Sequence, residues 1–114
     1  MQTAAPDPLV GDELLEITLE AYHVRFTFMK SVLQIGAPFV VWFSEEPATR
    51  IDPNVRSGDL ASVWPLIGKV VKTVAWNETV TLVFDGMVKI AIGPSPCGLR
   101  GTIMGRRDMT VEDF

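Results

Sequence analysis

The residue types that could carry out nucleophilic or acid–base chemistry are scarce in this chain. His23 is the single histidine and Cys97 is the single cysteine, so a nucleophile activated by histidine would have to use His23. Cys97 lies in a Pro-Ser-Pro-Cys-Gly-Leu segment, in which the nearby Arg100 would favour the reactive thiolate. Nothing in the sequence brings His23 and Cys97 together, and an enzyme that uses His23 or Cys97 is therefore the less favoured hypothesis.

Carboxylates are more numerous, but their spacing indicates a solvated loop. Glu45, Glu46 and Asp52 fall within the polar segment 44–58, where paired carboxylates could act as acid and base. An exposed charged loop explains the same composition. A zinc ion would have to be completed by carboxylates beyond one histidine and one cysteine, and the glycines form no phosphate-binding pattern before a helix. We therefore predict no catalytic, metal-binding or cofactor-binding residue.

Tryptophans and arginines supply the candidate interaction residues. Trp42, Trp64 and Trp76 could stack on a sugar or a base. Each lies in an apolar run that favours core packing, and an exposed tryptophan would favour a contact between two copies of the chain. A basic cluster near the C-terminal end could bind an acidic partner or a phosphate, although three acidic residues in the same tail would offset its charge. The candidate interaction residues are Trp42, Trp64, Arg100, Arg106 and Arg107.

The composition favours a folded domain that binds neither nucleic acid nor membrane. Hydrophobic residues make up 47% of the chain, which is too many for a disordered segment. The formal net charge of −4 disfavours a general nucleic-acid binder and would suit a basic partner. No apolar run reaches the roughly 18 residues of a membrane span. The N-terminus lacks the features of a signal peptide and a lone cysteine fits a reducing compartment, so we expect a cytoplasmic protein.

Alternation of apolar and polar residues predicts a domain that is mainly β, bordering on α+β. Period-two runs and short β-branched or aromatic runs predict strands that are separated by turn residues. Ser57 or Asp59 could cap a short helix near residues 58–66, which Pro65 would end early. The predicted strands are 16–20, 23–28, 32–35, 39–43, 70–76, 79–84 and 88–92, with 99–104 as a further edge strand.

The strongest local signal is the Asp85-Gly86 pair between two alternating runs, which predicts a β-hairpin. A two-residue turn would pair Phe84 with Met87 and mix the two faces of the hairpin. A three-residue loop, Asp85-Gly86-Met87, keeps the apolar side chains on one face, so we predict that loop. The predicted core pairs are Phe84–Val88, Leu82–Ile90 and Val80–Ile92.

Two turns in the N-terminal half follow from the same requirement that apolar residues share a face. The first, at Ala21-Tyr22, places His23 on the outer face opposite Glu20. The second is placed at Lys30-Ser31. The predicted core pairs are Leu19–Val24 and Ile17–Phe26 for the first hairpin, and Phe28–Leu33 and Phe26–Ile35 for the second.

Two segments of the chain are weakly similar to each other. Residues 28–36 align with residues 84–93 when one gap is allowed, and a proline-containing break follows each segment. The pattern is typical of a chain built from two related halves, but two unrelated hairpins with similar cores would produce it as well. A two-half pseudo-repeat is one of these two interpretations.

A pattern of hydrophobic alternation with a turn runs over about residues 60–93. It consists of Leu66-Ile67-Gly68, Val70, Val74, Thr81–Gly86 and Ile90. The pattern resembles that of small uncharacterised bacterial β-rich proteins, some of which look like immunity proteins encoded beside toxins. The resemblance implies a style of fold and a bacterial protein, and it carries over no functional residue.

Together these observations predict one fold and three functions. We predict an antiparallel sandwich or partly open barrel of seven or eight short strands, with a flexible lead-in at 1–11, a β-rich domain at 12–105 and a tail at 106–114. The favoured function is a non-enzymatic protein-binding or assembly module that forms a homodimer or blocks a partner, toxin inhibition being one version. The second is a small-ligand-binding barrel, and the third is an enzyme. The ligand pocket would be lined by Phe26, Phe28, Phe39, Trp42, Trp76 and Phe84.

Overall fold

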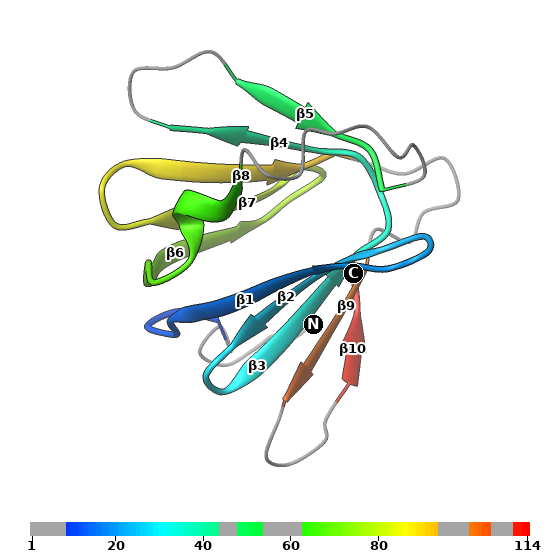
Figure 1. Cartoon of the computed structure of the whole chain (residues 1–114), viewed down its shortest axis with the longest axis horizontal. Coiled ribbons are helices and arrows are strands. Elements are labelled where there is room, and N and C mark those ends of the chain that lie inside the picture. Colours follow the sequence, from blue (N-terminus) through cyan, green and yellow to red (C-terminus); the bar gives the residue numbers. More distant parts are fainter. Residues whose placement is uncertain (1–8, 44–47, 54–62, 94–100, 106–110) are drawn as a thin grey trace.

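The protein is an antiparallel β-sandwich (Figure 1). The computed structural model describes residues 9–43, 48–53, 63–93, 101–105 and 111–114, with the backbone alone for 111–113. This part of the chain forms ten strands in two five-stranded sheets. The strands are β1 (Leu14–Leu19), β2 (Val24–Phe28), β3 (Ser31–Ile35), β4 (Phe39–Trp42), β5 (Thr49–Ile51), β6 (Val71–Trp76), β7 (Val80–Phe84), β8 (Val88–Ile92), β9 (Gly101–Gly105) and β10 (Val111–Asp113).

The two sheets draw strands from both halves of the chain. In the orientation of Figure 1, the lower sheet has the order β1-β2-β3-β9-β10 and the upper sheet has the order β5-β4-β8-β7-β6. The predicted mainly β sandwich is confirmed, with more strands than the seven or eight expected. The predicted helix near 58–66 is a 3₁₀ turn where it is described, at residues 63–66, and residues 54–62 lie outside the described part. Pro65 stands inside this turn, which explains why it is short.

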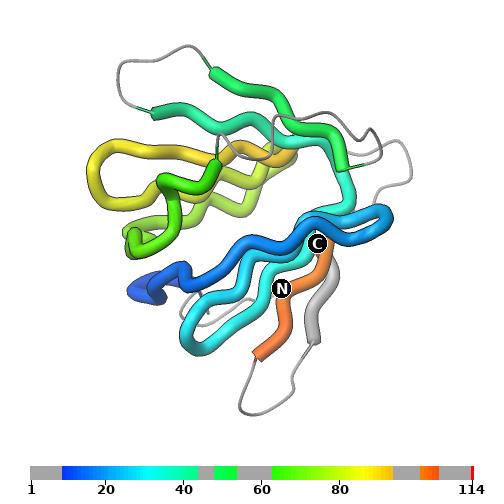
Figure 2. Tube along the Cα trace, in the orientation of Figure 1, coloured from blue at the N-terminus to red at the C-terminus, as the bar shows by residue number. Residues whose placement is uncertain are grey.

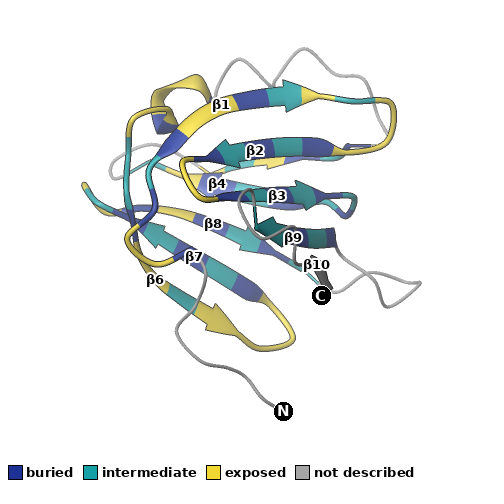
Figure 3. Cartoon of the chain, turned by 90° about the horizontal axis from the view of Figure 1, so that it is seen from below, coloured by how far each residue is buried: buried dark blue, intermediate teal, exposed yellow. Residues whose placement is uncertain are grey.

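The core lies between the sheets and is made by the alternation that the sequence shows (Figure 3). Inward-facing residues of β2, β3, β7 and β8 are at most 3% exposed, while their neighbours face outward. Phe26 packs edge-on against Phe39 with ring centroids 5.8 Å apart. Phe28 stacks on Phe84 across the two sheets at 6.5 Å. Such aromatic pairs add about 0.5–1.5 kcal/mol each beyond the area they bury.

The predicted β7–β8 hairpin is confirmed in loop length and register. Phe84 pairs with Val88, Leu82 with Ile90 and Val80 with Ile92. The loop takes two residues of positive φ, Gly86 at 77° and Met87 at 62°. Asp-Gly therefore marks a three-residue loop here, because this odd length keeps the apolar face continuous and a two-residue turn would not.

The two N-terminal hairpins were predicted with unequal success. The β1–β2 register, Ile17 with Phe26 and Leu19 with Val24, is confirmed, although Leu19 is 42% exposed at the sheet edge and does not join the core. The β2–β3 register is wrong by two residues. Phe26 pairs with Leu33, and the turn is Met29-Lys30.

The cause of this error is that a two-residue slip leaves every side chain on its own face, so alternation cannot detect it. The turn is fixed by a distant residue instead. The Asp12 carboxylate, 4% exposed, accepts hydrogen bonds from the Lys30 amide at 3.1 Å to each oxygen. The Met29 amide donates to the Glu13 carbonyl at 3.0 Å. The segment before β1 therefore sets the position of the β2–β3 turn.

The two halves of the chain are related by an internal pseudo-two-fold symmetry. Gly11 and Gly68, 57 positions apart, both have positive φ, at 85° and 94°. The Gly11 amide donates to the Val71 carbonyl and the Gly68 amide donates to the Leu14 carbonyl, both at 2.8 Å. The pairing of β1 with β2 and that of β6 with β7 each shift register at the same place, after Leu14 and after Val71. The equivalence that the sequence suggested for residues 28–36 and 84–93 is part of this repeat.

The halves exchange their last two strands. β1–β2–β3 and β6–β7–β8 are equivalent three-stranded units, one in each sheet. After β3 the chain crosses through residues 36–38 to the upper sheet, where β4 and β5 add beside β8 (Figure 2). In return, β9 and β10 of the second half add beside β3 in the lower sheet. Each sheet is therefore completed by the opposite half of the chain.

Candidate functional site

The residues predicted for enzyme chemistry do not form a site among the described residues. His23 is exposed at the turn between β1 and β2, and its carbonyl accepts a hydrogen bond from the Glu20 amide at 2.8 Å. Its ring lies beside Gly36, where a Cβ added to the glycine would stand 3.4 Å from the histidine Cδ2. Asp52 follows β5 and is partly exposed.

The remaining residues of the enzyme hypothesis are Cys97, Glu45 and Glu46, and all three lie outside the described residues. Within the described ranges, no group of three or more histidine, cysteine, aspartate or glutamate side chains could hold a metal ion. The described part of the chain also has no helix with the length and apolar character needed to cross a membrane.

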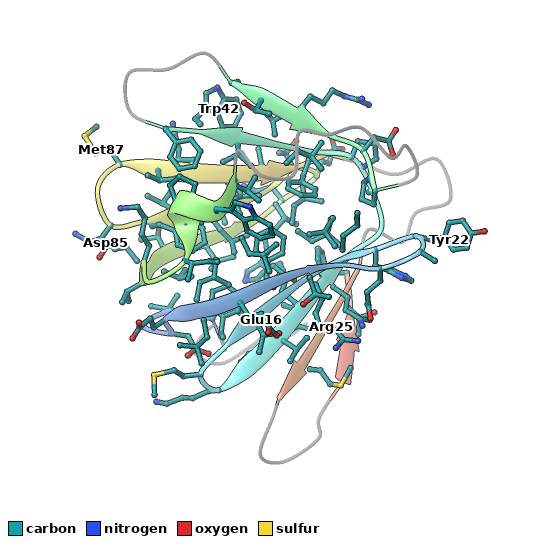
Figure 4. The ribbon with its side chains drawn as sticks, in the orientation of Figure 1. Glu16, Tyr22, Arg25, Trp42, Asp85 and Met87 are labelled. Atoms are coloured by element: carbon teal, nitrogen blue, oxygen red, sulfur yellow. The ribbon has the colours of Figure 1, made fainter. Side chains whose placement is uncertain are left out.

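The aromatic residues proposed to line a ligand pocket do not surround a common cavity. Phe26, Phe28, Phe39 and Phe84 are at most 1% exposed and pack on one another between the sheets. Trp42 lies on the outer face of the upper sheet (Figure 4). The ring of Trp76 packs edge-on against Phe114, with centroids 5.7 Å apart, where the ends of β6 and β10 meet.

The tryptophans lie at the surface, and the expectation that they pack in the core is wrong. Trp42 is 36% exposed, Trp64 is 45% exposed in the 3₁₀ turn at 63–66, and Trp76 is 40% exposed. Each belongs to an apolar run, but none is enclosed between the sheets. Trp42 faces away from the opposing sheet, Trp64 lies in the 3₁₀ turn outside both sheets, and Trp76 is the last residue of β6. Arg100, Arg106 and Arg107 lie outside the described residues.

The outer face of the upper sheet carries mostly apolar or small side chains. Register places Trp42, Lys89, Val83 and Thr73 in one row across β4, β8, β7 and β6. The Lys89 ammonium lies 5.8 Å from the centre of the Trp42 ring, within the range of a cation–π contact. The other row is Arg50, Val40, Ala91, Thr81 and Ala75. We call these nine residues the upper face.

The outer face of the lower sheet is more polar, and two of its residues are bound to one carboxylate. The Glu20 carboxylate pairs with the Arg25 guanidinium and accepts a bond from the Gln34 amide at 3.4 Å. Its rows, read from the register, are Thr18–Arg25–Gln34–Thr102 and Glu16–Thr27–Val32–Met104. We call these eight residues the lower face.

The pseudo-symmetry allows the two faces to be compared position by position. Arg25 and Gln34 of the lower face correspond to Thr81 and Ala91 of the upper face, so the polar network has no counterpart there. The lower face contains the carboxylate of Glu16, whereas the nine residues of the upper face include two cations and no carboxylate. The other equivalent pairs, lower face first, are Thr102–Val40, Met104–Trp42, Val32–Lys89, Thr27–Val83, Glu16–Thr73 and Thr18–Ala75.

Of the upper-face residues, sequence reasoning identified only Trp42 as a candidate. The alternation in 80–92 that gave the core face also implied the outward set Thr81, Val83, Lys89 and Ala91. That set could have been noticed because it contains a single charge. Its continuation onto β4 could not have been found, because the 45 residues 43–87 separate β4 from β8 in the sequence.

No protein-family model, curated protein or solved structure matches this chain.

Proposed function

We propose that this chain is a non-enzymatic protein-binding module that binds its partner on the upper face. The observation that carries the proposal is the contrast between two faces built on one backbone repeat. On the lower face, Arg25 and Gln34 are bound to the Glu20 carboxylate. The equivalent face presents Trp42, Val40, Val83 and Ala91 with two cations, and none of its nine residues is a carboxylate. An exposed patch that combines an aromatic residue and other apolar side chains with a few charged groups is typical of a protein interface.

The charges of the upper face favour a partner with acidic groups. Lys89 stands in the middle of the face and Arg50 stands at its β5 edge, and no described carboxylate of the face neutralises them. The net charge of the whole chain would suit a basic partner, but the partner meets this face first at short range, where local charge complementarity decides specificity. Inhibition of a toxin that carries an acidic patch is one form that such binding would take.

A photocrosslinking experiment tests where the partner binds. A photoreactive phenylalanine analogue replaces Val83 in one variant and its equivalent, Thr27, in the other. Both side chains face outward from the strand next to a sheet edge and are half-buried, so the substitutions disturb the two sheets alike. We expect cells of the source organism to yield one defined crosslinked protein with the Val83 probe and none with the Thr27 probe.

The crosslinked protein is then purified and its binding to the intact chain is measured by calorimetry. Trp42→Ala and Lys89→Glu are expected to weaken binding by about tenfold or more each, as central interface residues do. The matched variants Met104→Ala and Val32→Glu occupy the equivalent lower-face positions and should leave the dissociation constant within about twofold. Equal losses from both faces, or no defined crosslink at Val83, would contradict the proposal.

A further inference from the structure

One segment of the chain joins the two halves covalently, whereas non-covalent contacts join them throughout the sandwich, because both sheets contain strands of both halves. The first half ends with β5 and the second begins with the 3₁₀ turn at 63–66, and only residues 54–62 join the described parts of the two. Neither half contains a complete sheet, because three strands of each half lie in one sheet and two lie in the other. A half therefore buries its apolar faces only when it meets a complementary half.

The strand pairs that join the halves are equivalent in both directions. Leu33 of β3 pairs with Ile103 of β9, and the corresponding Ile90 of β8 pairs with Val41 of β4. All four of these side chains are at most 5% exposed. Each half thus pairs the last strand of its three-stranded unit, β3 or β8, with a strand of the other half.

A second set of contacts joins the starts of the halves. The Leu14 amide donates to the Lys69 carbonyl at 2.9 Å, and in the equivalent bond the Val71 amide donates to the Asp12 carbonyl at 3.0 Å. Glu13 and Val70, also equivalent, form a β-bridge with each other. The stacked rings of Phe28 and Phe84 are another equivalent pair that meets in the core. Reciprocal contacts of this kind are those of an isologous dimer interface.

We propose that the halves of this chain can pair in trans, so that two copies form a dimer by exchanging halves. In this dimer, the first half of each copy completes its two sheets with the second half of the other copy. None of the contacts above depends on the segment 54–62, so the same contacts form whether the halves belong to one chain or to two. The tether raises the effective concentration of the intramolecular partner, so the exchanged dimer is favoured when chains fold together at high concentration.

This inference does not depend on the proposed function. Exchange leaves each sandwich with the same upper and lower faces, and a partner that binds the upper face would find one on each sandwich of the dimer. The homodimer expected from the sequence then arises from paired halves and leaves the upper face free.

A complementation experiment with full-length chains tests the inference. Leu33→Asp places a charge in the core strand of the first half, and Ile90→Asp does so at the equivalent position of the second half. Each variant refolded alone should be unfolded by circular dichroism. When both are mixed in denaturant and refolded together, the intact first half of one chain can pair with the intact second half of the other. We expect a heterodimer with roughly half of the native signal per chain.

Light scattering and mass tags identify that species. A mixed sample that contains no heterodimer and recovers no native signal would overturn the inference. If either variant folds alone, a second substitution, Phe26→Asp in the first half or Leu82→Asp in the second, removes the remaining stability, since both side chains are fully buried.

A cleaved chain gives a second measurement that needs no core substitution. A protease site replaces residues within 54–62 of the full chain, which is folded first and then cut. We expect the two fragments to stay together at the elution volume of the uncut protein. After unfolding and refolding with an isotope-labelled sample, they should exchange into hybrid pairs. Fragments that separate or precipitate after cutting would show that the halves need their tether.

Discussion

Gly11 and Gly68 occupy the same position in the two halves and make the same hydrogen bond, each to the strand that begins the other half. Both have positive φ, and a Cβ added to either would meet no atom within 4 Å. The requirement for glycine is therefore conformational, because space for a side chain exists. The two glycines turn the chain into β1 and into β6 and so set how the halves meet.

Gly11→Ala and Gly68→Ala should each lower the free energy of unfolding by about 1–2 kcal/mol, the cost of a left-handed backbone with a Cβ. The measurement is urea denaturation followed by circular dichroism. Gly93→Ala is the control, since Gly93 has no positive φ and its added Cβ also meets nothing within 4 Å. This control should be neutral or slightly stabilising. If Gly93→Ala costs as much as the other two, backbone strain is not the cause.

Met87 gives the opposite prediction, because it is a non-glycine residue at a φ of 62°. Its side chain is 77% exposed and contributes little packing. Met87→Gly should therefore raise the free energy of unfolding by about 0.5–1 kcal/mol, through relief of backbone strain. Met29 in the β2–β3 turn is 57% exposed without positive φ, so Met29→Gly should lower stability. The idea fails if both substitutions shift the denaturation midpoint in the same direction.

Gly101 is required for a different reason. Gly101 begins β9 and pairs with Ile35 of β3, and a Cβ on it would overlap the Gln34 carbonyl oxygen and stand 3.0 Å from the Phe114 ring. Because the first obstacle is backbone, Gly101→Ala must move β9 away from β3 and should cost about 3 kcal/mol or more. Gly36→Ala, whose Cβ would meet the His23 ring at 3.4 Å, should be tolerated. Thermal unfolding of the two variants distinguishes these cases, and equal melting temperatures would refute the assignment.

The sequence allowed prediction of those parts of the fold that are governed by alternation. The β7–β8 and β1–β2 registers followed from keeping Phe84, Leu82 and Phe26 on one face. The short strands β5 and β10 were not predicted, because three residues carry too little periodicity to reveal a strand. The exchange of strands between halves was not predictable either, since the pairing of Val41 with Ile90 leaves no local signal.

The candidate site was predicted less well than the fold, for a physical reason. Trp42 was identified as a residue type, but the upper face is made by neighbours that meet it only through register across four strands. Val83 and Ala91 are common residue types. They become notable only when their neighbours on the upper face are known and when they are compared with their equivalents in the other half, Thr27 and Gln34. A one-dimensional pattern contains neither comparison.

Asp12 and Asp85 each bind a backbone amide near a turn, and the bonds of Asp12 explain why the β2–β3 register was predicted wrongly. Asp12, before β1, accepts from the Lys30 amide and from the Glu13 amide at 3.1 Å and is almost fully buried. Asp85, in the equivalent turn of the second half, accepts from the Val70 amide at 3.3 Å. In the first half, a side chain before β1 therefore holds the β2–β3 turn. In the second half, a side chain in the β7–β8 turn binds the amide that precedes β6.

Asp12→Ala should lower the free energy of unfolding by about 1–3 kcal/mol, because two partly buried amides lose their acceptor, whereas Asp85→Ala should cost about 1 kcal/mol or less. Hydrogen exchange separates this local effect from a general loss of stability. Protection of the Lys30 amide should fall in Asp12→Ala more than that of the Thr27 amide, and the Val70 amide should respond to Asp85→Ala alone. If the Lys30 amide stays as protected as in the parent protein, Asp12 does not hold the turn, and the β2–β3 register must then be set by packing of Phe26 against Leu33.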